Sequence, residues 1–368
     1  MKRIIKKSLL RFGGYALAQN LYSRFENYAL IKNIRKFIDT GNIPPPDMVM
    51  FEPTMRCNLR CKMCYQKRDM HTGCGELTTE QIAGFFDRNP YLKKVSLMGG
   101  EIFMRPDIIN IIRNLDRTRD LVLSTNGTLI GDAEICELRK CRNIFTICIS
   151  LDGPKKVHEK IRGLHGSYDK IVKTVEALAA VLPLTITCVI QNDNITILPD
   201  VVDLCADMGV KKVNFEFERI YSEEAIARTK DCMDIESAEI PVSSGGRVRE
   251  YSSGILQGKL DECQARGGKV GIYVTFKPSF LRDEIKACYS GYIRTKSRYY
   301  CHGFRTATIA PNGDLIHCLI LRKSFGNILN EPFDSLWNSE TANNFRRQLI
   351  KNNLTPLCEN CPRMVPYD

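Results

Sequence analysis

The stretch MVMFEPTMRCNLRCKMCY, residues 48–65, joins a short apolar run to three closely spaced cysteines. The run 48–52 has the length and composition of a buried strand. Cys57, Cys61 and Cys64 follow it within eight residues, so their thiolates can bind three of the four irons of one cubane and leave the fourth iron open. A structural zinc site needs four ligands, normally from two short cysteine hairpins, and this loop fits such a site poorly.

Downstream of this stretch, short apolar or β-branched runs alternate with longer amphipathic stretches. The predicted strands are 48–52, 94–98, 120–124, 144–150, 184–190 and 212–217. The predicted helices between them are 79–88, 106–116, 131–140, 168–181 and 198–208. This alternation predicts an α/β fold in which parallel βα units close into a partial (β/α)6 barrel of the TIM type. We therefore expect the chemistry at the carboxyl ends of the strands.

Composition limits the class of protein. The chain has 368 residues, 43% of them hydrophobic and 26% charged, which suffices for one large domain and a small appendage. Sixteen cysteines are many for an intracellular protein but too uneven for a small disulfide scaffold, which favours metal ligation. The net charge of +11 suits an acidic small molecule or an anionic lipid surface, and equally a basic surface that only keeps the protein soluble. We expect no nucleic-acid partner.

The N-terminal segment has its own pattern. Apolar residues recur at three- and four-residue steps over residues 1–40, which predicts an amphipathic helix, broken at Gly13 and Gly14, with a mostly basic polar face. Two hypotheses follow: the helix packs across the main domain, or it lies on an anionic membrane surface. Because no run is long enough to span a membrane and Lys6 and Lys7 interrupt any signal peptide, we expect a cytoplasmic protein.

The Cys-x3-Cys-x2-Cys spacing after the first strand of a βα barrel resembles the radical S-adenosylmethionine superfamily. In that family the open iron is chelated by the amino and carboxylate groups of S-adenosylmethionine, and an electron from the cluster cleaves the cofactor to a 5′-deoxyadenosyl radical. The family usually has an aromatic residue before the third cysteine, where the backbone meets the adenine. That position is Met63 here, and Tyr65 follows the third cysteine.

Later strand ends extend the resemblance. In similar enzymes a Gly-Gly-Glu turn receives the ammonium of the cofactor, residues after the third strand hold its ribose, and a serine and an arginine of the fourth βα unit meet its carboxylate. A carboxylate suits a cation, and arginine suits bidentate recognition of a carboxylate. The resemblance therefore implies the following cofactor contacts: Gly99, Gly100, Glu101, Ser124, Asn126, Ser150, Asp152 and Arg162.

The tail carries a second cysteine set, which consists of Cys301, Cys318, Cys358 and Cys361. With Gly313 between the first two, the set resembles the auxiliary-cluster domain called SPASM, or its shortened form called Twitch. A hairpin around 311–313 would bring the first two cysteines together, and a helix near 339–351 would deliver the last two. Because only four ligands remain, the resemblance implies one auxiliary [4Fe–4S] cluster bound by protein alone. A structural zinc site on the same cysteines, or Cys288 as a ligand, are the alternatives.

The resemblance divides the chain into a basic helical segment (1–44), a barrel (45–290) and an auxiliary-cluster domain (291–368). It implies an oxidoreductase-type enzyme that abstracts a substrate hydrogen atom, with the auxiliary cluster relaying electrons. The expected outcome is oxidation, epimerisation or bond formation on a small metabolite or lipid, with a flavodoxin- or ferredoxin-type reductant. A maturase acting on a ribosomally made peptide or a protein side chain, and a non-catalytic electron-transfer or redox-sensing protein, are the alternatives.

Residues past the fifth and sixth strands are the candidates for contact with substrate. A carboxylate there could act as a base if burial raised its pKa, although solvation at the surface is the simpler interpretation. The catalytic candidates are Glu216, Glu218 and Tyr221. Further candidates for substrate contact are Gln191, Asn192 and Arg219.

Overall fold

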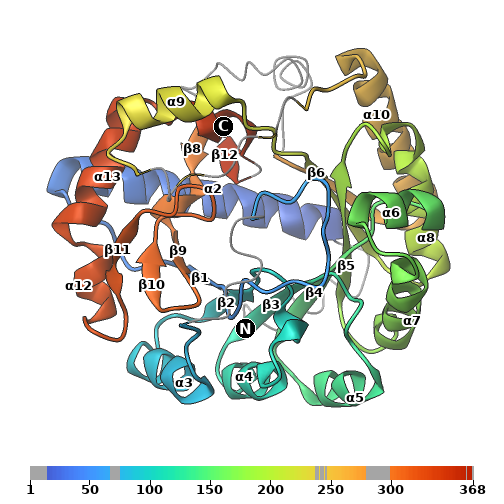
Figure 1. Cartoon of the computed structure of the whole chain (residues 1–368), viewed down its shortest axis with the longest axis horizontal. Helices are drawn as coiled ribbons and strands as arrows, with labels where there is room; N and C mark the ends of the chain where they lie inside the picture. Colours follow the sequence, from blue (N-terminus) through green and yellow to red (C-terminus); the bar gives the residue numbers. More distant parts are fainter. Residues whose placement is uncertain are drawn as a thin grey trace.

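The computed structural model describes residues 15–66, 75–236, 240, 244, 247–278, 299–361 and 363–366. A curved sheet of ten strands dominates this part of the chain, in the order β11-β10-β9-β1-β2-β3-β4-β5-β6-β7 (Figure 1). The six strands predicted from the sequence are all present, and each pairs in parallel with the next. They are β1 (Met48–Phe51), β2 (Lys94–Leu97), β3 (Asp120–Thr125), β4 (Ile144–Ser150), β5 (Leu184–Ile190) and β6 (Lys212–Phe217).

Helices cover the outer side of this sheet (Figure 1), which confirms the predicted α/β partial barrel. The five predicted helices are present as α3 (Thr79–Arg88), α4 (Ile108–Asp116), α5 (Asp132–Lys140), α7 (Ser167–Ala179) and α8 (Leu198–Asp207). Helices and short turns that the sequence pattern missed are η1 (Ile102–Met104), α6 (Lys155–Arg162), η2 (Ile195–Ile197), α9 (Glu223–Cys232) and α10 (Ser253–Val270). Capping fixes several helix starts: the Thr78 hydroxyl accepts from the Gln81 amide, and the Gln81 side chain accepts from the Thr78 amide.

The two faces of the sheet differ in chemistry. Apolar side chains such as Val49, Leu97 and Phe215 are fully buried against the helices. Because side chains alternate along a strand, the intervening residues face the concave side, where hydroxyl and amide groups bond to one another across strands. Examples are Thr146 with Thr185, at 3.0 Å, and Thr275 with Asn214, at 3.1 Å. This polar concave face contrasts with the packed branched residues of a closed TIM barrel and suits a ligand chamber.

The sheet continues beyond the predicted barrel on both sides. The strand β7 (Tyr273–Lys277) adds in parallel to β6, and β9 (Thr306–Ile309) adds in parallel to β1, pairing Met48 with Thr306. The predicted hairpin around 311–313 is confirmed as β9 with β10 (Asp314–Ile316), and β11 (Ser324–Asn327) completes that edge. The predicted boundary at residue 290 lies outside the described residues, so the division into domains stays a prediction.

The C-terminal elements gather beside this edge of the sheet (Figure 1). They are β8 (Tyr299–Cys301), η5 (His302–Phe304), α12 (Phe333–Trp337), α13 (Glu340–Lys351), η6 (Pro356–Asn360) and β12 (Met364–Pro366). The helix predicted near 339–351 is therefore confirmed. Strands β8 and β12 pair in an antiparallel ribbon of their own.

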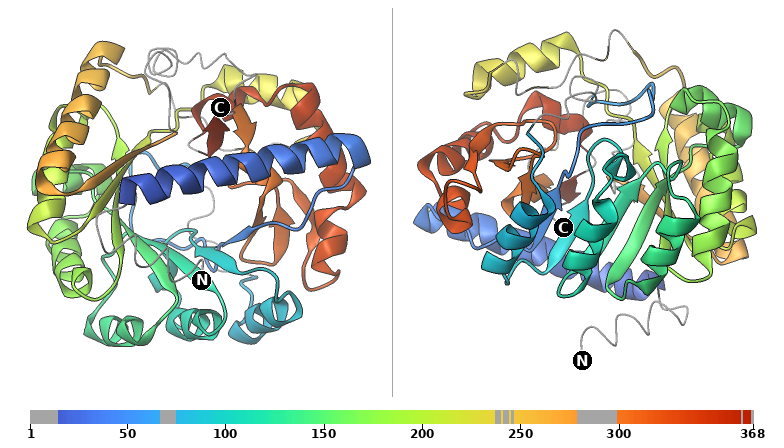
Figure 2. Two further views of the ribbon diagram at one scale, coloured as in Figure 1. Left: turned by 180° about the vertical axis from the view of Figure 1, so that it is seen from behind. Right: turned by 60° about the horizontal axis from the view of Figure 1, so that its bottom comes forward.

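The helix α2 (Tyr15–Thr40) lies across the open end of the curved sheet (Figure 2). Leu30, Ile34 and Phe37 are at most 4% exposed, and Phe37 meets the Phe304 ring edge-on just before β9 begins. The helix therefore closes the end at which the strands start. This position confirms that α2 packs on the barrel, whereas membrane contact stays a prediction. The predicted break at Gly13 and Gly14 lies outside the described residues. Within the described ranges, no helix is both long and apolar enough to cross a membrane.

Candidate active site between two cysteine sets

The first cysteine set lies in the loop after β1. Cys61 and Met63 are buried with Leu59 and Ile161, and Cys57 and Cys64 pack against the same cluster. The Leu59 amide donates to Cys57 Sγ at 3.4 Å, as an amide does to a thiolate ligand. Burial, together with the charges of Cys61, Glu101 and Cys64, raises the pKa of Cys57 to about 11, and the hydrogen bond from Leu59 opposes this shift. Thiolates placed here need a compensating cation, and the irons of a cluster supply one.

The Gly-Gly-Glu turn after β2 packs directly on the backbone of this loop. The Gly100 amide donates to the Thr54 carbonyl at 3.0 Å, and the Glu101 amide donates to the Arg56 carbonyl at 2.8 Å. A Cβ atom at Gly100 would lie 2.2 Å from the Arg56 carbonyl oxygen. The two glycines are therefore required for contact between the turn and the cysteine loop.

The side chain of Glu101 joins the ends of β2 and β3. It is fully buried and accepts from the Thr125 hydroxyl and the Asn126 amide, each at 2.6 Å, and from the Phe103 amide at 3.1 Å. Burial raises the pKa of Glu101, and these hydrogen bonds oppose that shift. A buried carboxylate with oxygen lone pairs beside the cysteine loop fits an ammonium group such as that of S-adenosylmethionine.

The predicted ribose contacts are held by neighbours that the sequence pattern missed. The Asn126 amide group donates to Asn58 Oδ1 at 2.9 Å, and the Asn58 amide group donates to the Thr128 hydroxyl at 2.9 Å. These bonds tie the end of β3 to the residue after Cys57. Ser124, on β3, is partly exposed and directly precedes Thr125, whose hydroxyl donates to Glu101.

Asp152 and Arg162 form a buried pair after β4. Arg162 Nε donates to Asp152 Oδ2 at 2.6 Å, while Asp152 Oδ1 accepts from the Val189 amide at 2.9 Å. Arg162 Nη1 donates onward to Cys61 Sγ at 3.7 Å. The structure therefore directs Arg162 toward a cysteine of the first set and commits Asp152 to holding it. Ser150, at the end of β4, is partly exposed.

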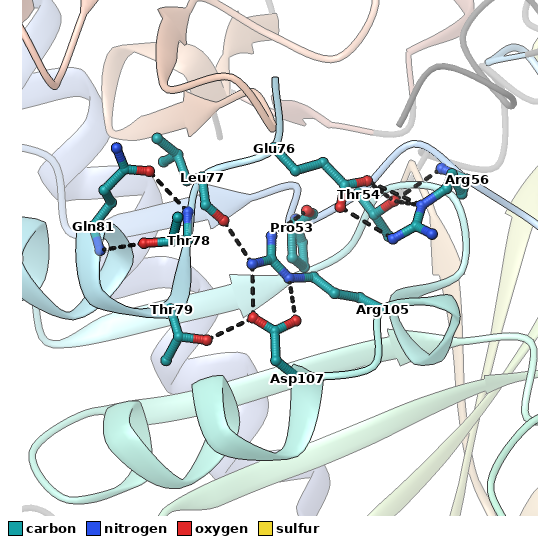
Figure 3. Close-up of polar contacts among 10 residues, drawn as sticks. All are labelled: Pro53, Thr54, Arg56, Glu76, Leu77, Thr78, Thr79, Gln81, Arg105 and Asp107. Atoms are coloured by element: carbon teal, nitrogen blue, oxygen red, sulfur yellow. Dashed lines mark hydrogen bonds and ion pairs between the residues drawn. The ribbon is translucent and has the colours of Figure 1, made fainter. Parts of the chain in front are cut away.

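A network around Arg105 fixes the base of the cysteine loop (Figure 3). Arg105 is 5% exposed and donates to the carbonyl oxygens of Pro53, at 2.9 Å, and Leu77, at 2.6 Å. Its Nε also pairs with Asp107 at 2.7 Å, and this hydrogen bond lowers the pKa of that carboxyl to about 2. Arg105 therefore joins three segments that flank the loop. No motif in the sequence marks Arg105.

We expect Arg105→Met to destabilise the protein by about 2–3 kcal/mol, because it leaves two buried carbonyls and Asp107 without their donor. Urea unfolding of the reconstituted protein followed by circular dichroism measures this change. The matched control is Arg113→Met, which removes an exposed pair with Glu137 and should cost at most about 0.5 kcal/mol. Equal effects of the two substitutions would contradict the assigned role of Arg105.

The second cysteine set converges in the tail. Cys301 ends β8, Cys318 follows β10, and Cys358 and Cys361 lie in and just after η6. Strand pairing sets Cys301 opposite Met364, three residues after Cys361. Burial raises the pKa of Cys301, and the charges of the other three cysteines contribute to the same shift. The predicted alternative ligand Cys288 lies outside the described residues.

Hydrogen-bond donors surround this second set. The Gly303 amide donates to Cys301 Sγ at 3.3 Å, and the Leu321 amide donates to Cys318 Sγ at 3.1 Å. In the described part of the chain, no three His, Cys, Asp or Glu side chains are close enough together to hold one metal ion. Each cysteine of a cubane binds a different iron, so the set fits a cluster better than it fits zinc.

His317 contacts Cys301 Sγ through Nε2 at 3.4 Å, and burial lowers its pKa to about 3. A neutral imidazole that donates to a thiolate stabilises the reduced, more negative cluster. We therefore expect His317→Phe to lower the reduction potential of the auxiliary cluster by on the order of tens of millivolts. A redox titration followed by electron paramagnetic resonance measures the potential. An unchanged potential would exclude this hydrogen bond, and His165→Phe serves as the control.

Two contacts connect the surroundings of the two cysteine sets. Glu52, at the end of β1, is fully buried and accepts two hydrogen bonds from Arg322, at 3.3 and 2.9 Å. Arg322 lies four residues after Cys318. Tyr65 directly follows Cys64 in the sequence, and the Arg219 guanidinium lies 4.4 Å from the centre of its ring. The sequence pattern does not predict the Glu52–Arg322 pair, although a charged residue directly after a buried strand indicates that a partner of opposite charge lies nearby.

The substrate candidates lie at the same end of the sheet. A pocket beyond β5 and β6 is lined by Gln191, Asn192 and Glu218, among others. Burial raises the pKa of Glu218, and the ion pair with Arg247 opposes that shift. Arg247 also donates to the Lys62 carbonyl at 2.8 Å.

The other two catalytic candidates have different surroundings. Glu216 faces the concave side and accepts from Asn214 at 3.0 Å. Tyr221 is 2% exposed, and its hydroxyl has no partner in the described part of the chain.

Comparison with known proteins agrees with this geometry. A family described as the radical SAM superfamily matches residues 51–205, and an iron–sulfur cluster-binding domain called SPASM matches residues 301–362. The chain is 25% identical to the AdoMet-dependent heme synthase of Methanosarcina barkeri, over 86% of this chain and 88% of that protein. It is 24% identical to the PqqA peptide cyclase of Gluconobacter oxydans, over 82% of this chain and 79% of that protein.

Solved structures show the same fold. The crystal structure of Streptococcus suis SuiB bound to the precursor peptide SuiA superposes with a TM-score of 0.65, covering 95% of this chain and 76% of that one at 16% identity. SuiB bound to S-adenosylmethionine gives a TM-score of 0.64 at the same identity, covering 98% of this chain and 82% of that one. At this level of identity the likeness shows the fold alone.

Proposed function

Because the chain belongs to the radical S-adenosylmethionine superfamily and carries a SPASM domain, we propose that it removes a hydrogen atom from a C–H bond of an organic substrate held between its two cysteine sets. The observation that carries the proposal is the order of groups at one edge of the parallel sheet. The cysteine loop, Glu101, Asn126 and the Asp152–Arg162 pair follow the first four strands in turn and are joined by hydrogen bonds.

The cofactors of this family are a [4Fe–4S] cluster, S-adenosylmethionine and an auxiliary iron–sulfur cluster, which supply the deoxyadenosyl radical and an acceptor for the substrate electron. Cys57, Cys61 and Cys64 would hold the first cluster, and Arg162 would balance the charge of Cys61. Glu101 would bind the cofactor's ammonium group from its buried position. Met63, whose backbone would meet the adenine, and Ser124 and Ser150, on the concave face, complete the proposed contacts.

The auxiliary set has a separate role in this proposal. The four tail cysteines would hold a cluster coordinated by protein alone, so the substrate would contact side chains of the chamber rather than an open iron. Loss of one hydrogen atom, one electron and one proton from the substrate is a net two-electron oxidation, which fits dehydrogenation or bond formation. We place a small metabolite or lipid first as the substrate class.

A peptide is the second candidate substrate. The relatives named above include a peptide cyclase, and the solved SuiB structure contains a precursor peptide. In addition, β7 pairs with β6 on one side and forms an edge of the ten-stranded sheet, and extended peptides add to such edges. Product analysis with peptide and small-molecule pools would separate the two classes.

The first test of the proposed function needs no substrate. After anaerobic reconstitution, reductant and S-adenosylmethionine are added, and 5′-deoxyadenosine is measured by chromatography. We expect deoxyadenosine from the intact chain and none from Cys61→Ala, because that substitution removes the ligand that Arg162 contacts. If the intact chain formed no deoxyadenosine and S-adenosylmethionine left the spectrum of the reduced cluster unchanged, an electron-transfer protein would be the better description.

A further inference from the structure

Three side chains occupy the space between the two cysteine sets: Tyr65, Arg219 and Tyr221. Arg219 lies over the Tyr65 ring. Burial disfavours its charge, but the two tyrosines and Cys361 of the second set favour it and keep its pKa raised. Burial also raises the pKa of Tyr221, whose charge interactions include Arg219, Cys361 and Cys318. Arg219 therefore contacts the residue after Cys64, and both Arg219 and Tyr221 are near enough to the second set to interact with its charges.

Both residues present buried polar atoms that lack a hydrogen-bond partner. In the described ranges, neither Arg219 Nη1 nor the Tyr221 hydroxyl has a donor or acceptor within reach. Buried polar groups in proteins are normally hydrogen-bonded, and a buried group left unpaired costs about 1–3 kcal/mol. Two such atoms on neighbouring residues therefore indicate a site that a ligand completes.

The charges around Arg219 indicate the chemistry of that ligand. Three carboxylates at this end of the sheet are bound by other arginines: Glu52 by Arg322, Glu218 by Arg247 and Asp152 by Arg162. The charge of Glu216 also favours the Arg219 cation, but the Glu216 side chain accepts its hydrogen bond from Asn214. Arg219 has no ion pair of its own with an aspartate or glutamate in the described structure. A guanidinium in this position matches the geometry of a carboxylate, and a tyrosine hydroxyl can donate to the same group.

We propose that Arg219 and Tyr221 bind a carboxylate group of the substrate in the chamber between the two cysteine sets. The inference rests on the proposed function, because it describes the substrate of the same site. The carboxylate would fix one end of the substrate near the second set, leaving the rest of the molecule to extend toward Cys64 and the first set. An uncharged amide of the same shape would bind more weakly, because it leaves the guanidinium charge unbalanced.

The test uses a carboxylate and its isosteric amide on the reconstituted protein saturated with S-adenosylmethionine. Isothermal titration calorimetry compares glutarate with glutaramide. We expect glutarate to bind and glutaramide to bind at least tenfold more weakly. Arg219→Gln is expected to weaken glutarate at least tenfold and Tyr221→Phe several-fold, whereas Arg113→Gln, which changes an exposed arginine, leaves the affinity unchanged.

Glutarate binding with the same affinity to Arg219→Gln, or no glutarate binding by the intact chain, would overturn the inference. If S-adenosylmethionine excluded glutarate, the site would belong to the cofactor, and this result would also overturn the inference. If Arg219→Gln does not fold, Arg219→Lys keeps the charge without the planar fork and is expected to give an intermediate loss. Deoxyadenosine formation by the same intact preparation tests the proposed function separately, since that assay needs no carboxylate.

Discussion

Replacing Cys358 and Cys361 by alanine is expected to lower the iron content of the reconstituted protein from about eight atoms to about four. The two cysteines supply half of the second set, and their partners Cys301 and Cys318 alone cannot hold a four-iron cluster. Iron is counted colorimetrically after gel filtration, together with zinc by mass spectrometry. Substrate oxidation should be lost with the auxiliary iron, while the first set keeps its own cluster.

The control for this experiment replaces two cysteines outside both sets, Cys136 and Cys141, by alanine. Cys136 is exposed and Cys141 is partly exposed on and just after α5, so the iron content should not change. The alternative is a structural zinc site at the second set. It would be shown if the intact chain and the Cys358→Ala/Cys361→Ala variant both held about four irons, and only the intact chain held zinc tightly.

Gly100→Ala is expected to abolish formation of 5′-deoxyadenosine and to reduce iron at the first set. The new methyl group would lie 2.2 Å from the Arg56 carbonyl oxygen and 2.5 Å from the Met55 carbonyl oxygen. Both atoms are backbone, so the loop that carries the first three cysteines must move. The same substitution breaks the hydrogen bond from the Gly100 amide to Thr54. Iron counting and the deoxyadenosine assay measure the two effects.

Gly258→Ala is the matched control because a methyl group at Gly258, inside α10, meets no atom within 4 Å. Alanine in a helix is more stable than glycine by about 0.5–1 kcal/mol, so this variant should fold at least as well and keep full iron content. If Gly100→Ala retained the iron and deoxyadenosine yield of Gly258→Ala, the close packing of the turn on the cysteine loop would not be needed for function.

The predicted elements were most accurate where periodicity was strong. The strands at 144–150, 184–190 and 212–217 and the helix at 79–88 have the predicted boundaries, because alternating or continuous apolar runs and a capping box are local signals. The helices α6 and α9 were missed because their compositions are strongly polar, with few apolar residues to set a period. The strand β7 was missed because it is short and only partly buried.

The candidate site divides in a similar way. The cysteine spacings and the Gly-Gly-Glu turn are readable in the sequence because each set of residues is short and chemically distinctive. The partners of such residues cannot be read from the sequence, since Arg162 lies 101 positions from Cys61 and Arg322 lies 270 positions from Glu52.

The sequence by itself determined the α/β class, the strand order from β1 to β6 and the two cysteine sets, because these depend on local periodicity and on the spacing of ligand residues. Tertiary structure alone decided that β9 joins β1, that α2 closes the end at which the strands begin, and that Arg219 Nη1 is buried with no hydrogen-bond partner among the described residues. These features depend on contacts between segments that are far apart in the sequence, which local periodicity does not record.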